Sequence, residues 1–207
     1  MKKLIIGVFI LQIIILAYLG IPAGGAANAV WRDAQTGLVV RQDNPTHTIE
    51  SYRNLVKHES YDAAVLLFEP AVQKSINGDL LRASEEFTGQ NKAELVKVIS
   101  SNVIGYYAVA AMIQILESAP EQPVISLLTL RQAEGKWEIV QDMYNADLNE
   151  IQQVFERAIE VCQTIMKEPF ANLTETQRAN LMMQAGIGSQ YIEANLQQLN
   201  EMMRSTK

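Results

Sequence analysis

The sequence predicts an α+β fold in which a curved antiparallel sheet packs, cone-like, on helices that precede it, followed by a C-terminal helical hairpin. Apolar residues recur at helical spacing over residues 44–69, strand-like runs follow up to residue 143, and helical spacing then returns. Helices that precede a sheet in this way are typical of an α+β domain. The predicted organisation is therefore a leader (residues 1–29), a lead-in segment (30–43), the α+β domain (44–144) and the helical hairpin (145–207).

The first predicted helix begins at Asn44-Pro45, because asparagine is a favoured N-cap and proline fits the first helical turn. A second, short helix begins at Tyr61 and ends before Pro70. The apolar residues of the first helix share one face: Ile49, Tyr52, Leu55 and Val56.

The next stretch carries weaker patterns. Residues 71–76 fit a short strand, and residues 77–79 fit a turn. Residues 80–90 are polar and fit no single element. Asn91 and Glu94 have the spacing of a capping box, which predicts a third helix over residues 92–100.

The sheet follows. Residues 103–117 are rich in β-branched and aromatic side chains and predict a strand. Residues 124–132 and 136–143 predict a hairpin with a two-residue loop at Glu134-Gly135, which pairs Arg131 with Glu138. One face of that hairpin is apolar: Leu128, Leu130, Trp137, Ile139 and Met143. The polar face, which carries Arg131, Glu138 and Asp142, meets solvent or a cover.

After residue 145 two capping patterns predict two helices, one from Asp147 with Glu150 and one from Thr174 with Gln177. Both carry long apolar stripes. Gly186 interrupts the second helix, as does Gly188 two residues later, and we expect close helix approach or a kink there. The stripes are satisfied either by folding back over the outer face of the sheet or by pairing with a second copy.

The first 29 residues have the three parts of a secretory signal peptide: two lysines, an uncharged run over residues 4–21, and an Ala-x-Ala step that ends at Ala29. We expect export to the extracellular space or the cell envelope, in a style typical of bacteria, with cleavage after Ala29. The alternative is an anchor through residues 4–21, which are just long enough to span a bilayer.

Composition excludes several partners. Removing the two leader lysines from the 17 basic residues leaves 15 against 23 acidic ones, a net charge of −8. Nucleic acid needs a basic face, so we expect no nucleic-acid partner, and we expect contact with the membrane only through an uncleaved leader. Cys162 is the only cysteine, so the fold has no internal disulfide, and we expect a buried, inert thiol.

Three segments carry a resemblance to a known superfamily: NPTHTIESYRNLVKHESYDAAVLLF at residues 44–68, GQNKAELVKVI at 89–99, and TLRQAEGKWEIVQDM at 129–143. Together they resemble the nuclear transport factor 2-like superfamily, including its SnoaL-like members, over about residues 44–144. The resemblance implies a cone-shaped fold with a cavity between helices and sheet. Members include ketosteroid isomerases, dehydratases, hydrolases and cyclases, as well as exported domains with no known reaction, so fold alone does not choose a function.

The candidate ligand-binding residues are Tyr52, Tyr106, Trp137 and Gln141. Tyr52 lies on the inward stripe of the first helix, and Gln141 shares the inward face of the last strand with Trp137. We expect no catalytic residue, no cofactor and no metal. The two histidines, His47 and His58, are eleven residues apart on the outer helical face and lack the spacing of metal ligands.

An acid inside the cone would indicate catalysis. Arg131 and Asp142 fall on the polar side of the hairpin, where Arg131 is expected to pair with Glu138, and Glu85-Glu86 is an acidic pair with no assigned partner. The sequence therefore favours an exported, non-enzymatic domain that binds a small apolar ligand or peptide, or that serves as an assembly module at the envelope. The alternatives are an isomerase, dehydratase or cyclase that uses Tyr52 with a carboxylate, and an oligomerisation module, such as a homodimer, driven by the C-terminal helices.

Overall fold

The computed structural model describes residues 29–103, 105–141, 143 and 146–205. The predicted leader therefore lies outside the described residues, apart from Ala29, and so do Asp142 and Tyr144. The elements follow one another in this order: β1 (Val30–Arg32), β2 (Val39–Arg41), α2 (Pro45–Lys57), α3 (Tyr61–Val65), α4 (Pro70–Gln73), α5 (Gly78–Thr88), the 3-10 turn η1 (Gln90–Lys92), β3 (Glu94–Ser100), β4 (Tyr107–Ile115), β5 (Val124–Ala133), β6 (Lys136–Val140), α6 (Leu148–Lys167) and α7 (Glu175–Ser205).

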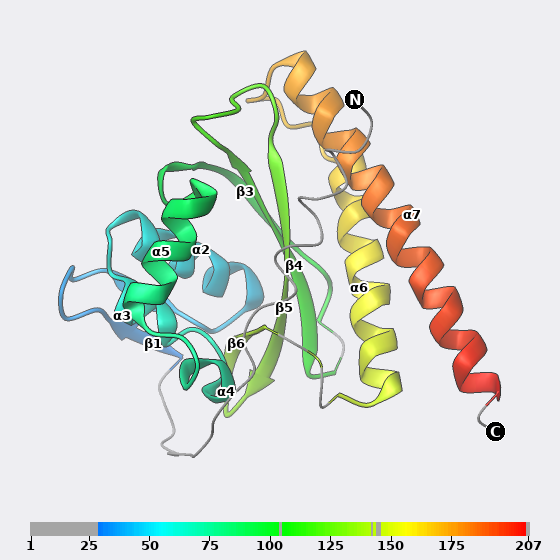
Figure 1. The fold of residues 1–207 in the computed structure, drawn as a ribbon, viewed down its shortest axis with the longest axis horizontal. Helices are drawn as coiled ribbons and strands as arrows, with labels where there is room; N and C mark the ends of the chain where they lie inside the picture. The colour runs from blue at the N-terminus through cyan, green and yellow to red at the C-terminus, as the bar shows by residue number, and fades with distance from the viewer. Residues whose placement is uncertain (1–28, 104, 142, 144–145, 206–207) are drawn as a thin grey trace.

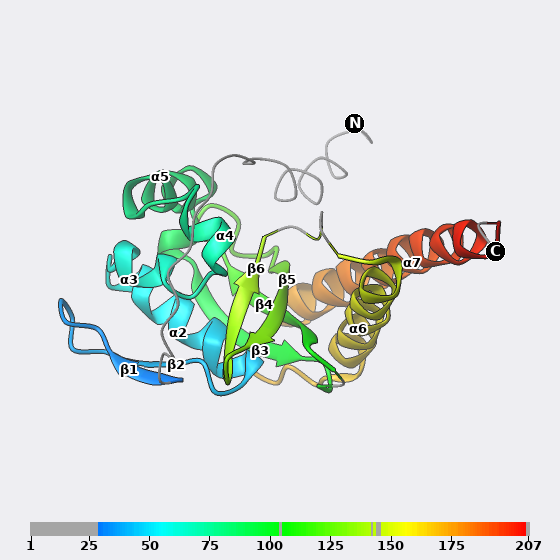
Figure 2. The ribbon, with the colours of Figure 1, turned by 90° about the horizontal axis from the view of Figure 1, so that it is seen from below.

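The fold is built around one central sheet with helices on both of its sides (Figure 1). An antiparallel sheet in the order β3-β4-β5-β6 lies in the middle, with α2 to α5 on one side and α6 on the other. Helix α7 packs on α6 and forms the outermost layer, as the second view also shows (Figure 2). The predicted α+β class, with helices before the sheet and a helical hairpin after it, is confirmed.

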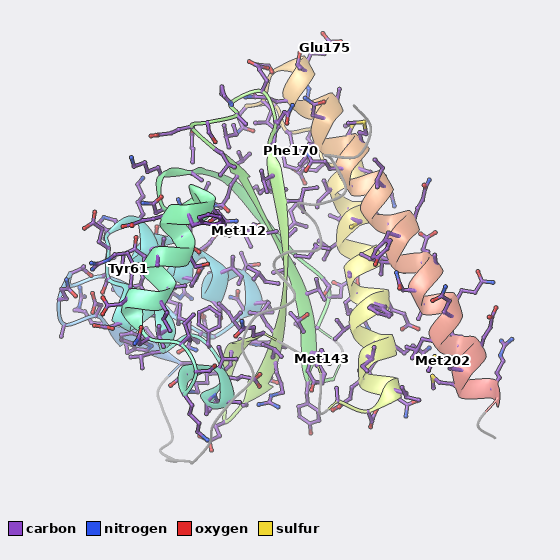
Figure 3. The ribbon with its side chains drawn as sticks, viewed as in Figure 1. Tyr61, Met112, Met143, Phe170, Glu175 and Met202 are labelled. Carbon is purple, nitrogen blue, oxygen red and sulfur yellow. The ribbon has the colours of Figure 1, made fainter. Side chains whose placement is uncertain are left out.

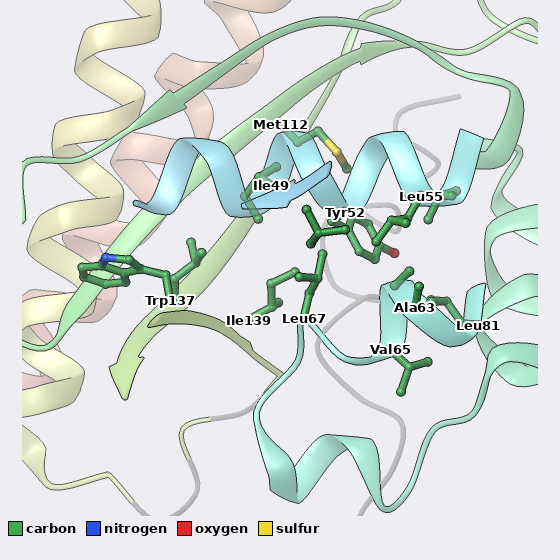
Figure 4. Packing of buried hydrophobic residues seen from close by; sticks show 14 of the residues in the cluster. Ile49, Tyr52, Leu55, Ala63, Val65, Leu67, Leu81, Met112, Trp137 and Ile139 are labelled. Atoms are coloured by element: carbon green, nitrogen blue, oxygen red, sulfur yellow. The ribbon is translucent and has the colours of Figure 1, made fainter. Parts of the chain in front are cut away.

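Helix α2 forms where the sequence predicts it. Asn44 caps it, because its side-chain oxygen accepts a hydrogen bond from the backbone N–H of His47 at 2.8 Å. The predicted stripe is buried and faces the sheet, where it meets the apolar side of the β5–β6 hairpin (Figure 4). The core between α2 and the sheet includes Ile49, Tyr52, Leu55, Leu67, Met112, Leu130, Trp137 and Ile139.

Strand β4 is buried on both faces, which explains why its sequence shows no alternation of polar and apolar residues. Ala110 and Met112 belong to the core beneath α2, whereas Val109 and Ala111 belong to a second core beneath α6. The strand predicted over residues 103–117 is therefore confirmed in its central part.

The β5–β6 hairpin has the predicted register. Arg131 pairs with Glu138, and Leu130 pairs with Ile139. The loop is the expected pair Glu134-Gly135, and both residues have positive φ values, 50° and 80°. A two-residue turn whose backbone twist matches that of the strands requires this left-handed conformation at both positions.

Other expectations are wrong. The helix predicted over residues 92–100 is replaced by the end of η1 and by strand β3, which begins at Glu94. Residues 71–76 form no strand, because residues 71–73 belong to helix α4. The unassigned residues 80–90 belong mainly to α5. The lead-in segment 30–43 forms the small β1–β2 ribbon. Gln42 connects this ribbon to the sheet, because the backbone oxygen of Gln42 accepts a hydrogen bond from the N–H of Trp137 at 2.8 Å.

The outer face of the sheet is covered by α6. Val154, Ala158, Val161 and Ile165 pack against Val109, Ile113 and Ile125 in the second core. Met143 packs against this same core and not against the face of Trp137, which corrects its predicted placement. The C-terminal helices thus fold back over the sheet, one of the two arrangements that their stripes allowed.

Both predicted caps of these helices are present. Asp147 and Glu150 form a complete capping box at the start of α6. Before α7, the Thr174 N–H donates to Gln177 Oε1 at 2.9 Å, and the Gln177 N–H donates to Thr174 Oγ1 at 3.2 Å. These bonds satisfy backbone donors that a helix N-terminus leaves unpaired.

Candidate functional site

The four candidate ligand-binding residues do not converge on one place. Tyr52 and Trp137 are buried in the core beneath α2, with 6% and 2% of their surface exposed, and other core side chains lie between them (Figure 4). Tyr106 is 72% exposed in the turn before β4, so it does not share an interior site with Tyr52 and Trp137. Gln141 is half-buried directly after β6.

The structure places an acid beside Tyr52. Its hydroxyl donates to Glu85 Oε1 at 2.7 Å in a buried hydrogen bond between α2 and α5. Burial raises the pKa of Glu85 above its ordinary value, because the charged carboxylate loses solvation, and the bond from Tyr52 offsets only part of this effect. Burial and the nearby Glu85 charge also raise the pKa of Tyr52 well above its usual value.

Arg53 completes this interior polar centre. Its Nη2 donates to the backbone oxygen of Ala93 at 2.5 Å, and its Nη1 is buried without a hydrogen-bond partner. Desolvation lowers the pKa of Arg53, while the charge of Glu85 acts in the opposite direction. A guanidinium and a carboxyl group share this interior, so each offsets part of the cost of burying the other.

Sequence reasoning missed Glu85 because residues 80–90 received no assignment. The signal was present: Asn77 caps α5 through a bond from the Leu80 N–H, and Leu81 and Glu85 lie one helical turn apart on its buried face. Chemically, Tyr52 and Glu85 could hold or pass a proton. However, neither residue lines the surface hollow beside Arg131 or the one along the C-terminal part of α7.

The first of those hollows, of about 200 Å³, is lined by residues of β4, β5 and β6, and Arg131 Nη2 pairs there with Glu69 at 3.1 Å. The expected Arg131–Glu138 ion pair is therefore wrong: Glu138 is buried and pairs with Lys136 at 2.9 Å. The lining is mainly polar and charged: Glu69, Tyr107, Arg131, Val140, Met143, Ala146 and Glu150. Such a lining does not suit the small apolar ligand that the sequence favours.

The described residues contain no group of three or more His, Cys, Asp or Glu side chains that could hold a metal ion. His47 Nδ1 instead lies 2.8 Å from Asp43 Oδ1, and His58 Nδ1 lies 2.8 Å from the backbone oxygen of Asn54. Cys162 is buried, and burial raises the pKa of its thiol to about 11, as befits an inert side chain.

Helix α7 carries more exposed large apolar side chains than any other helix in the described part of the chain. Met183, Ile187 and Tyr191 are spaced four residues apart, and they are 55%, 56% and 63% exposed. The inner side of α7 is already used, because Leu181, Ala185 and Leu199 are buried. We call the row Met183, Ile187 and Tyr191 the outer stripe; sequence analysis found the apolar pattern but not which side stayed exposed.

Comparison with known protein families and with curated proteins gives no match. Among solved structures, the chain is similar to a SEC-C motif containing protein from Rhodopseudomonas palustris that was determined in solution. The similarity has a TM-score of 0.39 at 18% sequence identity, and it covers 48% of this chain and 77% of that one. Separately, none of the described helices is both long enough and apolar enough to cross a membrane.

Proposed function

We propose that this protein is an exported, non-enzymatic assembly module of the cell envelope, which docks onto a protein partner through the outer stripe of α7. The observation that carries the proposal is the exposure of Met183, Ile187 and Tyr191 on a helix whose inner side is packed. Exposed apolar residues that form a contiguous row are typical of an interaction site, whereas isolated ones are not. Export rests on the leader pattern in residues 1–29.

The interior supports assembly over capture of a small apolar ligand. Tyr52 makes an edge-to-face contact with Phe68, with ring centroids 5.7 Å apart, and Trp137 sits in the same packed core. These aromatic rings therefore serve to hold α2 on the sheet. We propose that the α+β body is a member of the nuclear transport factor 2-like group, used here as a scaffold for the helical hairpin.

A second candidate function is an isomerase, dehydratase or cyclase. The observation in its favour is the buried acid beside Tyr52, because a carboxyl group whose pKa is raised by burial suits general acid–base work. It requires substrate to reach the Tyr52–Glu85 pair. Exchange of Glu85 for Gln would abolish such turnover while leaving docking through α7 intact.

The docking proposal is tested by site-specific photo-crosslinking in intact producing cells. A photoreactive side chain at Ile187 is expected to give a discrete cross-linked product that contains an envelope protein or a second copy of this chain. The matched control is the same group at Lys57, which is exposed on the opposite helical layer. Equal products at both positions, or no product at Ile187, would contradict the proposal.

A further inference from the structure

The partner of the outer stripe can be deduced from the charges of α7, on the premise that the proposed docking function holds. The helix has 31 residues, which corresponds to a length of about 46 Å. Its described part carries five charged side chains, and four of these lie near its ends: Glu175, Arg178, Glu201 and Arg204. Figure 3 marks the two ends by Glu175 and Met202.

The four end charges have an internal symmetry. Glu175 precedes the point between Ser189 and Gln190 by as many residues as Arg204 follows it. Arg178 and Glu201 are related by the same point, but Arg178 precedes the buried Leu181 and Ala185 by three and seven residues. It therefore lies on the packed side of α7 and does not face a second copy at the outer stripe. Glu175 and Arg204 are both exposed and have opposite signs, so a two-fold axis through this point would set Glu175 of each copy level with Arg204 of the other.

The middle of the helix is compatible with the same axis. Its one charge, Glu193, falls opposite Gly186 of a second copy, so no like charges meet there. The carboxylate of Glu193 already accepts a hydrogen bond from Ser189 Oγ at 2.9 Å. Met183 and Ile187 of one copy supply exposed apolar surface on one side of the axis, and the same residues of the second copy supply it on the other side.

We propose that the outer stripe binds the outer stripe of a second copy of this chain, antiparallel, about a two-fold axis between Ser189 and Gln190. The apolar middle removes exposed Met183 and Ile187 from water. The charges at the ends of α7 favour the antiparallel direction and this register of the two helices. A parallel pair would set Glu175 against Glu175 and Arg204 against Arg204. Charged flanks determine partner and orientation in paired helices in the same way.

A charge exchange tests the register. The protein, purified as its own cell processes it, is measured by sedimentation equilibrium at low salt as wild type, Glu175→Lys, Arg204→Glu and the double variant. Each single variant is expected to weaken dimerisation about three- to tenfold, since it sets like charges together at both symmetric ends. The double variant is expected to return to within about twofold of wild type, because opposite charges face each other again.

Both single changes also reduce the stability of helix α7. Glutamate in the first turn and arginine in the last turn interact favourably with the helix dipole, and each change removes one of these interactions. A purely structural effect would therefore make the double variant weaker than either single variant, and that result would overturn the proposal. A wild type that stays monomeric overturns it as well, as does a dimer that no single variant weakens. If Ile187 nevertheless crosslinks another envelope protein in cells, the docking function stands and only the second-copy inference fails.

Discussion

Glu85 is the residue through which the interior of this fold responds to pH. Its carboxyl group is buried, accepts from Tyr52 and lies near the charge of Arg53. A buried carboxyl group binds its proton more tightly in the folded than in the unfolded state, since desolvation disfavours the charge. Glu85 therefore couples folding to pH, whether or not a ligand ever reaches it.

The sign of that coupling can be stated. Because the folded-state pKa of Glu85 is raised from 4.5, its contribution to the free energy of unfolding is fullest below pH 4.5 and is lost as pH rises through the folded-state pKa. The stability of wild type relative to Glu85→Gln should therefore fall as pH rises from 4 to 8. Urea unfolding of both variants at several pH values checks this; a relative stability that rises with pH would contradict it.

A carboxyl group whose pKa is lowered in the folded state changes stability with pH in the opposite direction. Hydrogen bonds, chiefly from the Thr36 side chain, lower the pKa of Asp33, so its stabilisation is lost as pH falls. This contribution is shared by wild type and Glu85→Gln. The difference between the two variants removes it, which is why the comparison isolates Glu85.

Tyr52→Phe should destabilise the protein by about 1–3 kcal/mol, because a buried carboxyl group loses its hydrogen-bond donor. The matched control is Tyr61→Phe. The Tyr61 ring contacts the Arg82 guanidinium at 5.3 Å, and that contact does not need the hydroxyl, so we expect less than about 0.5 kcal/mol. Equal losses in chemical denaturation would refute a special role for the Tyr52–Glu85 bond.

At the scale of elements, local signals predicted those structures that local interactions determine. The Asn44 cap, the Asp147 capping box and the Glu134-Gly135 turn are all formed by neighbouring residues, and all were predictable. Residues 92–100 were not, because the Asn91 and Glu94 spacing imitates a cap. Strand β3 exists because it pairs with β4, a contact between distant segments that the sequence shows only as the β-branched residues Val96, Val98 and Ile99.

The glycines of α7 give a second element-scale expectation. A Cβ on Gly188 would lie 3.7 Å from Cys162 Sγ, which is ordinary contact. Gly188→Ala should therefore stabilise the protein by up to about 1 kcal/mol, since alanine is the better helix former. Gly78→Ala is the matched control and should destabilise, because its Cβ would overlap the Asp62 carboxylate and lie 3.0 Å from the Asp62 backbone nitrogen. Thermal unfolding of both variants would show shifts of opposite sign.

At the scale of the whole molecule, the predicted class was correct, and the C-terminal helices adopt one of the two arrangements that the sequence left open. The sequence could not show which side of α7 remains exposed. Both sides of that helix carry apolar residues, and only the packing of α6 determines that Leu181 and Ala185 are buried while Met183 and Ile187 are not. The sequence contains the signals for α5 and for its buried face, but not the contact of Glu85 with Tyr52, because that contact joins two helices.

Removal of residues 147–207 should prevent soluble folding. It would expose the sheet face that carries Val109, Ile113 and Ile125, which α6 covers in the intact chain. Such a large apolar surface promotes aggregation. The measurement is the soluble yield and the far-ultraviolet circular dichroism of the truncated protein beside the intact one; a soluble, cooperatively unfolding product would contradict this role for α6.

Light scattering of the naturally processed protein over a concentration series tests the outer stripe most directly. We expect wild type and the surface control Lys57→Glu to approach twice the monomer mass as concentration rises. Ile187→Glu should remain monomeric over the same range, with at least about tenfold weaker association, because it sets an unpaired carboxylate in an apolar contact. Wild type that keeps the monomer mass throughout, or Ile187→Glu that associates as wild type does, would contradict pairing through α7.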